Sequence, residues 1–228
     1  CGIPVLHETH HARTDRIDIV NLARNYGTLL SSRAYLGYTL NTSFSIGCFF
    51  AFLSSAPYVT IEILKIPPQV YGFFFIIVSL AYMSGNFIAT RISRRLGIDR
   101  MILLGCCFSL TGAVVLTTLS ILGFLSALAI FLPFALIAFG NGMSQPNAIA
   151  GSVSVNPLIA GTASGLMGFM QMVFAGLATV TVGYFQSDTD FIALAVTVMV
   201  GACCALASLT LVRNQTPEVP QEQEIAAE

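Results

Sequence analysis

Amide and hydroxyl side chains gather in one short stretch, residues 140–147, of an otherwise apolar sequence. A helix turns about 100° per residue, so these side chains fall on one face. Such a face can hydrogen-bond to water or to a ligand, whereas lipid offers it no partner. Two glycines and Pro146 interrupt the same segment. Two interpretations follow: a polar cavity that binds water or a ligand, and a structural kink at which the amide side chains bond to neighbouring helices. The stretch favours a polar cavity, with three ligand-binding candidates: Asn141, Gln145 and Asn147.

A second polar stripe follows the first long apolar segment, residues 37–64, which Pro57 interrupts as Pro146 interrupts the later one. Its polar residues recur at helical spacing and fall within roughly 100° of the helix circumference. We expect these residues, together with one from a later segment, to line the same cavity: Asn41, Ser45, Ser55 and Gln171. An apolar wall is predicted from nearby residues: Phe49, Phe50, Tyr58, Phe139 and Met143.

Glu62 is the only carboxylate within this first apolar segment. A charge at the centre of a bilayer costs about 2.5 to 3.5 kcal/mol on insertion scales. Lys65 follows three residues later and offers an ion pair at the membrane surface. Two hypotheses stay open: an interfacial acid paired with Lys65, and a group that couples transport to protons.

Residues 7–11 read His-Glu-Thr-His-His and match the H-E-x-x-H pattern of zinc proteases. In that chemistry two histidines of one helix bind zinc and the glutamate acts as a base. A third ligand is also needed, but the chain has no other histidine, and Pro4 is close by. A solvated turn fits this segment better, so we expect no metal, no cofactor and no enzymatic activity.

The composition indicates an all-α membrane protein. Of the 228 residues, 55% are hydrophobic and only 9% are charged, with a mean hydropathy of +0.80. Soluble domains carry about 25% charged residues, so this chain has too little charge to cover a surface that faces water. The net charge of −1 gives no basic stripe for nucleic acid. The expected partner is the lipid bilayer.

Hydropathy divides the chain into three parts. Residues 1–36 form a polar connector with an amphipathic segment suited to the membrane surface. Residues 37–212 form a six-helix transmembrane domain, and residues 213–228 a disordered cytoplasmic tail. The spans are predicted at about 37–64, 70–92, 101–122, 127–150, 160–185 and 191–212.

Basic residues predict the orientation. Six spans place both ends on one side, and assigning that side to the cytoplasm leaves only Lys65, of ten basic residues, outside.

The two interrupted polar spans each open a group of three, which is the pattern of two inverted three-helix repeats. The fifth span carries small residues on one side, where a partner helix can approach closely. The glycines concerned are Gly161, Gly165 and Gly168.

Five short motifs, spread over nearly the whole chain, carry a family resemblance. They are residues 6–9, 55–62, 94–97, 146–148 and 160–165 with Gln171. The sequence resembles the C-terminal half, helices 7–12, of a major facilitator superfamily transporter. It is most similar to the bicyclomycin-resistance (Bcr/CflA) branch of multidrug drug:proton antiporters.

The resemblance implies half of a twelve-helix fold whose N-terminal six helices are the missing partner. It also implies a cavity between the halves and proton-driven export of small amphipathic drugs, by alternating access, across a bacterial cytoplasmic (inner) membrane. The family's gating loop corresponds to Arg95, Gly97 and Arg100, although Arg94 stands where the family has Asp. Because the chain begins at Cys1, we expect a piece of a longer protein. The alternative is a self-contained six-helix channel or carrier that oligomerises through the glycine face.

Overall fold

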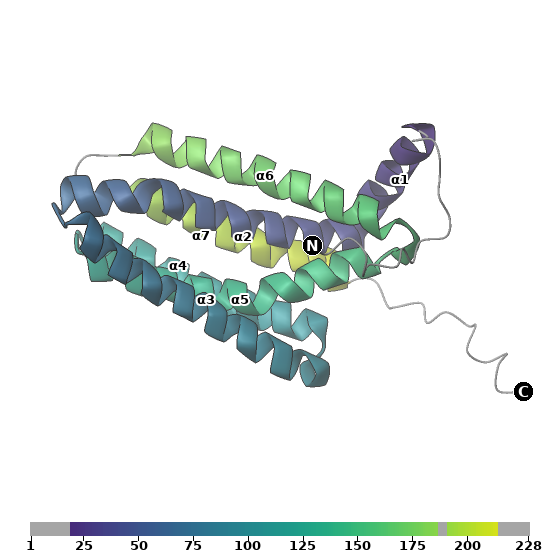
Figure 1. The fold of residues 1–228 in the computed structure, drawn as a ribbon, viewed down its shortest axis with the longest axis horizontal. Coiled ribbons are helices and arrows are strands. Elements are labelled where there is room, and N and C mark those ends of the chain that lie inside the picture. Colours follow the sequence, from purple (N-terminus) through teal and green to yellow (C-terminus); the bar gives the residue numbers. More distant parts are fainter. Residues whose placement is uncertain (1–18, 187–190, 214–228) are drawn as a thin grey trace, which may run out of the picture.

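The computed structural model describes residues 19–186 and 191–213, and within these ranges all regular elements are helices (Figure 1). Six helical segments are long and apolar enough to cross a membrane, which confirms the predicted all-α membrane fold. The elements are α1 (Ile19–Ser31), α2 (Arg33–Pro57), η1 (Tyr58–Ile63), α3 (Pro68–Leu96), α4 (Ile98–Ile121), α5 (Ala127–Ser154), η2 (Pro157–Ile159), α6 (Ala160–Phe185) and α7 (Ile192–Arg213).

Local sequence accounts for several helix ends. The hydroxyl of Ser32 accepts a hydrogen bond from the Tyr35 N–H at the start of α2, and Ser126 caps α5 in the same way through the Ala129 N–H. Gly97 has a φ of +84°, which few other residues adopt, and it separates α3 from α4 in a single residue. The arginines at the end of α3 are therefore held close to Arg100 at the start of α4.

Pro57 changes the helix type and does not end the first span. After it the chain continues as the π-helical turn η1, in which the Leu64 N–H donates to the carbonyl of Val59 at 3.0 Å. Proline has no N–H to donate, and a wider turn is one way to accommodate the missing hydrogen bond. By contrast, α5 remains α-helical through both Pro133 and Pro146.

The packing follows the repeat. α2, the first helix of its triplet, lies along α6 and α7, whereas α5, the first of the second triplet, lies along α3 and α4 (Figure 1). α2 also touches α5, and α4 touches α7, so exchanging the two triplets reproduces the same contacts. Each helix of the first triplet is followed three spans later by its equivalent, and because three is an odd number the two helices cross the bundle in opposite directions. This is the arrangement of two inverted repeats.

Two glycines bring α5 into backbone contact with both of its neighbours. A Cβ atom at Gly140 would meet the carbonyl of Gly105 and the Ser109 backbone on α4, and one at Gly142 would meet the carbonyl of Tyr82 on α3. Only a residue without a side chain allows this approach. The glycines of the 140–147 stretch therefore serve helix packing.

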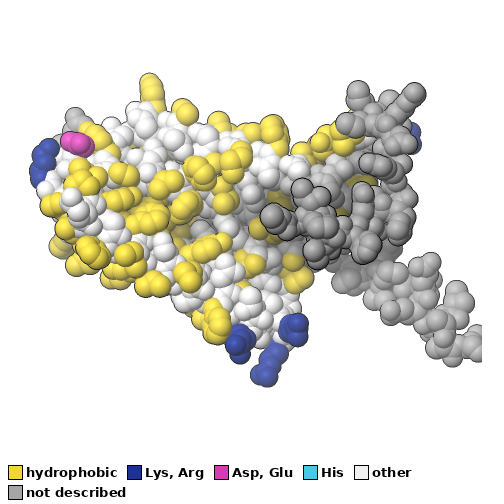
Figure 2. Space-filling view, in the orientation of Figure 1, with side chains coloured by type: hydrophobic (Ala, Val, Ile, Leu, Met, Phe, Trp, Pro, Cys, Tyr) yellow, Lys and Arg dark blue, Asp and Glu magenta, His cyan; other side chains and the backbone are white. Residues whose placement is uncertain are grey.

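The charged residues separate to the two ends of the bundle. Glu62, in η1, and Lys65, just after η1, lie at one end, where their side chains are 3.9 Å apart and exposed. The basic residues of α1, of the start of α2, of the α3–α4 turn and of the end of α7 lie at the opposite end. Figure 2 shows the body between them as largely hydrophobic. Such a body suits the hydrocarbon of a bilayer.

Candidate functional site

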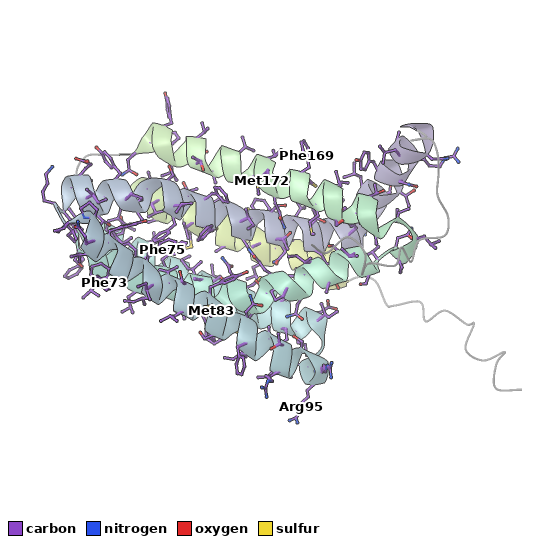
Figure 3. All side chains as sticks on the ribbon, viewed as in Figure 1. Phe73, Phe75, Met83, Arg95, Phe169 and Met172 are labelled. Atoms are coloured by element: carbon purple, nitrogen blue, oxygen red, sulfur yellow. The ribbon has the colours of Figure 1, made fainter. Side chains whose placement is uncertain are left out.

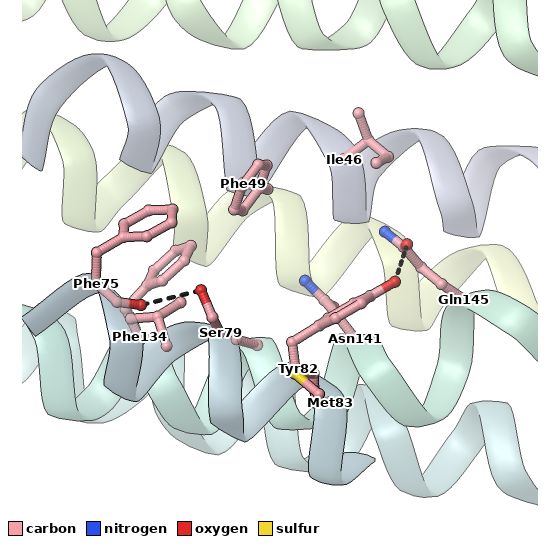
Figure 4. A pocket seen from close by; sticks show the side chains of 11 residues that line it. Ile46, Phe49, Phe75, Ser79, Tyr82, Met83, Phe134, Asn141 and Gln145 are labelled. Atoms are coloured by element: carbon pink, nitrogen blue, oxygen red, sulfur yellow. Dashed lines mark hydrogen bonds between the residues drawn. The ribbon is translucent and has the colours of Figure 1, made fainter. Parts of the chain in front are cut away.

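A cavity of about 320 Å³ lies between α2, α3 and α5 (Figure 4). This volume is at the lower end of the range of about 300 to 1,000 Å³ found for small-molecule sites. Its lining residues are Ile46 and Phe49 from α2, Phe75, Val78, Ser79, Tyr82 and Met83 from α3, and Phe134, Ala138, Asn141 and Gln145 from α5.

The polar groups of the cavity gather on α5 and on the facing part of α3. The Tyr82 hydroxyl donates to Gln145 Oε1 at 3.2 Å, and the Ser109 hydroxyl, from α4, donates to Asn141 Oδ1 at 3.1 Å. Both amide oxygens are thus occupied, while neither amide nitrogen makes a hydrogen bond within the described part of the chain. The amide nitrogens of Asn141 and Gln145 are the donors that this site can offer a ligand.

The rest of the wall is apolar and rich in aromatic rings, from Phe49, Phe75 and Phe134 (Figure 4). The Ser79 hydroxyl donates to the Phe75 carbonyl of its own helix at 3.1 Å, so it adds little polarity. All lining residues are uncharged. A wall of this kind suits the apolar part of an amphipathic molecule whose polar group reaches the amides.

The predicted cavity residues separate into two groups. Asn141 and Gln145 line the cavity, and Ser45 lies behind Asn141 in a small void that both residues share with Ser109. The other predicted residues do not line it. Asn41 donates to the Ala205 carbonyl at 2.8 Å, Ser55 to Gln186 Oε1 at 2.6 Å, and Asn147 to the Met143 carbonyl at 2.9 Å.

Gln171 and Glu62 also lie away from the cavity. Gln171 is half-buried on α6, which packs on α2 through the edge-to-face pair of Phe174 with Phe44, their ring centroids 4.8 Å apart. Glu62 is exposed at the end of the bundle beside Lys65. The expected wall residues Phe50, Tyr58, Phe139 and Met143 do not line this space either, whereas Phe49 does.

The predicted gating loop and glycine face both lie on the surface of this chain. Arg95, Gly97 and Arg100 are exposed at the α3–α4 turn. Beside them the Tyr38 hydroxyl donates to Asp99 Oδ1 at 2.7 Å and links α2 to the start of α4. A Cβ atom at any of the three predicted packing glycines would meet nothing within 4 Å. Gly161, Gly165 and Gly168 thus face outward.

Sequence reasoning missed the contribution of α3, which supplies five of the eleven lining residues. The segment looked like a plain span because its polar residues are few. A signal was present: Phe75, Ser79 and Tyr82 follow each other at steps of four and three, and so share one helix face. Nothing in that spacing says which neighbouring helix the face meets.

Comparison with known proteins identifies the family. The model of the Major Facilitator Superfamily matches residues 3–180. A bicyclomycin resistance protein homolog of Haemophilus influenzae is 28% identical over 213 residues, which are 91% of this chain and 50% of that protein. An uncharacterized MFS-type transporter of Bacillus subtilis, YdgK, is 28% identical over 161 residues, 70% of this chain and 40% of that protein.

The multidrug transporter MdfA of Yersinia pestis is 22% identical over 184 residues, 80% of this chain and 45% of that protein. The chain thus spans about half the length of the curated relatives that it matches.

The family match covers most of the chain, which therefore belongs to the Major Facilitator Superfamily. Its six helices, arranged as two inverted triplets, agree with half of that fold. The family and the relatives make it a transporter chain, not an enzyme. The histidine motif at residues 7–11 lies outside the described residues.

Proposed function

We propose that this chain is the C-terminal half of a proton-coupled exporter of small amphipathic drugs in a bacterial inner membrane. The observation that carries the proposal is the α2–α3–α5 cavity, an uncharged aromatic wall with two amide donors on one side. Two relatives, named for bicyclomycin resistance and for multidrug transport, support the substrate class. In this proposal Asn141 and Gln145 hold the polar part of the drug, and the phenylalanines hold its rings.

The partner in this proposal is a second six-helix half that covers α3 and α6. Along α3 large apolar side chains recur at steps of three and four on one exposed face, and Figure 3 shows Phe73 pointing away from the bundle. Along α6 the open glycine face lies beside exposed Phe169 and Met172. Rocking of the two halves about the shared cavity would give alternating access.

Proton coupling would then depend mainly on carboxylates of the other half. Glu62, the carboxylate of the first span, is exposed at the end of the bundle and paired with Lys65. It lines none of the cavity. A secondary role for Glu62 requires that the ion pair opens during the transport cycle.

The orientation follows from the basic residues. Of the eight lysines and arginines in the described ranges, seven lie at one end of the bundle and only Lys65 lies at the other. By the positive-inside rule the arginine-rich end faces the cytoplasm, so both ends of the described chain are cytoplasmic. The α3–α4 turn, with Arg95, Gly97 and Arg100, would then gate the cytoplasmic side.

A second candidate function rests on the open glycine face of α6. A helix of another copy could pack on Gly161, Gly165 and Gly168, which would make a self-contained oligomeric channel or carrier. This alternative predicts cross-links between copies through cysteines placed at these glycines. The exporter predicts cross-links within one full-length chain.

The test is drug tolerance conferred by the full-length protein in a strain that lacks its own exporters. Gln145→Ala removes a cavity donor, and Asn147→Ala removes an amide of the same helix that bonds only its own backbone. Losing one hydrogen bond of about 1 kcal/mol predicts a roughly five-fold loss of affinity for Gln145→Ala. Asn147→Ala should retain wild-type tolerance to bicyclomycin and other amphipathic antibiotics. Equal effects of both variants at equal expression would refute the proposed site.

A further inference from the structure

A second hollow lies on the opposite side of the bundle from the drug cavity. It is a groove of about 610 Å³ between the start of α4 and the end of α7, the two helices that lie behind α5 and α2 in Figure 1. Its walls are mainly apolar, and Leu103 is 47% exposed, so the groove opens outward from the bundle. The lining residues are Asp99, Arg100, Leu103, Leu206, Leu209, Thr210 and Val212.

A cluster of arginines lies at the end of the bundle where this groove opens, and Arg100 is the member of the cluster that lines the groove. Arg91, Arg94, Arg95 and Arg100 lie within ten residues, and all four are exposed. Figure 3 shows Arg95 at this end of the bundle, where Figure 2 shows a group of basic side chains. None forms an ion pair with a carboxylate in the described part of the chain. The Arg91 guanidinium sits over the Phe87 ring at 5.0 Å, a contact that leaves its charge in place.

The nearest carboxylate, Asp99, does not neutralise the cluster. Its Oδ1 accepts the Tyr38 hydroxyl at 2.7 Å, and it stands in the first turn of α4, where the helix dipole also favours a negative charge. Four arginines and one aspartate leave an excess of three positive charges. That charge lies at the same end of the bundle as the groove, and Arg100 carries part of it on the groove wall.

We propose that this groove binds an anionic phospholipid of the cytoplasmic leaflet, with its phosphate at Arg100 and the neighbouring arginines and an acyl chain along Leu103, Leu206 and Leu209. Guanidinium groups bind phosphate through two parallel hydrogen bonds, and basic pockets between transmembrane helices suit anionic headgroups. The groove is far larger than a phosphate ion needs and continues into leucines, which favours a lipid over soluble phosphate.

The lipid site is distinct from the surfaces assigned to the other half of the transporter. Those surfaces are the exposed faces of α3 and α6, whereas this groove is formed by α4 and α7. Acidic side chains of the other half are the competing partner for the arginines. They would neutralise the cluster without any need for the leucine-lined groove.

Native mass spectrometry of the full-length protein in detergent tests the headgroup. Dioleoylphosphatidylglycerol should remain bound and dioleoylphosphatidylcholine should not. Since each basic residue near an anionic surface contributes about 1 kcal/mol, Arg100→Gln should weaken phosphatidylglycerol binding roughly five-fold. Arg100→Lys should retain most of the binding, and Lys65→Gln, which removes a positive charge at the other end, should not change it. If Lys65→Gln weakens binding as much as Arg100→Gln, the groove is not the site.

A second pair of variants tests the groove itself. Leu103→Trp fills the groove, and Val114→Trp places the same side chain on α4 at a position that is also 47% exposed but outside the groove. Leu103→Trp should lower phosphatidylglycerol binding several-fold, and Val114→Trp should leave it unchanged. Glycerol 3-phosphate at the same concentration should not displace the lipid. Displacement by glycerol 3-phosphate, or equal binding by both variants, would overturn the proposal.

Discussion

The helices α2 and α5 occupy equivalent places in the two repeats, yet they use their polar side chains differently. On α2, Asn41 bonds to α7 and Ser55 bonds to Gln186, just after the end of α6, and both side chains are buried. On α5, Asn141 and Gln145 leave their amide nitrogens available on the wall of a cavity. A polar stripe on a membrane helix therefore indicates that its side chains do not face lipid. It does not say whether they join helices or bind a ligand.

The difference has a geometric cause in the order of residues along α5. Gly140 faces α4 and Gly142 faces α3, each in backbone contact, and Asn141 lies between them in the sequence. Successive residues of a helix point about 100° apart, so the glycines hold both neighbours while Asn141 and Gln145 share another face. On α2 the amide of Asn41 points instead at α7 and α4, where it meets Ala205 and Cys106.

The largest effect should come from filling the backbone contact of α5. Gly140→Val places side-chain atoms against Gly105 and Ser109, and overpacking of this kind costs about 1 to 3 kcal/mol or more. We expect a sharp fall in the thermal unfolding temperature and in the yield of folded full-length protein in detergent. Gly27→Val, at a helical glycine with nothing within 4 Å, is the control. Equal losses from both variants would show that valine in a helix, and not the contact, is responsible.

Replacing each of the two asparagines by alanine tests the comparison between α2 and α5 directly. Asn41→Ala removes hydrogen bonds between helices and should lower the free energy of unfolding by about 1 kcal/mol. Asn141→Ala should cost only a few tenths, since the Ser109 hydroxyl keeps the Ile137 carbonyl at 3.2 Å as its acceptor. Thermal unfolding and drug binding are measured on both variants. The comparison fails if Asn41→Ala weakens drug binding while Asn141→Ala mainly weakens stability.

The smallest overall effect, on stability alone and not on drug binding, is expected at the far end of α2. Ser55→Ala removes a hydrogen bond of 2.6 Å to Gln186 and should lower the free energy of unfolding by less than about 1 kcal/mol. Its exposed neighbour provides the control, Ser54→Ala, which should change nothing. Drug affinity should be unaffected in both. A clear loss of affinity in Ser55→Ala alone would place Ser55 with Gln145 in binding, against its observed contacts.

The sequence by itself determined the membrane character, the six spans, the inverted triplets and the charged ends. These depend on local composition: an apolar run of about 20 residues spans a bilayer whatever it packs against, and arginine near a span end marks one side. The positions of Asn141 and Gln145 could also be predicted, because a helical face follows from spacing alone. The close glycine contacts of α5 and the role of Asn41 could not.

Only the tertiary structure decided which helix each polar face meets. The carbonyl of Ala205 is 164 residues from Asn41, and Tyr82 is 63 residues from Gln145. Such pairs depend on how each helix is rotated and tilted against its neighbours, and no local pattern encodes that rotation. For the same reason α3 became a wall of the cavity, and Gly161, Gly165 and Gly168 faced outward. The spacing of residues in the sequence defined the polar and small-residue faces of each helix, and the packing of the helices determined which neighbour each face contacts.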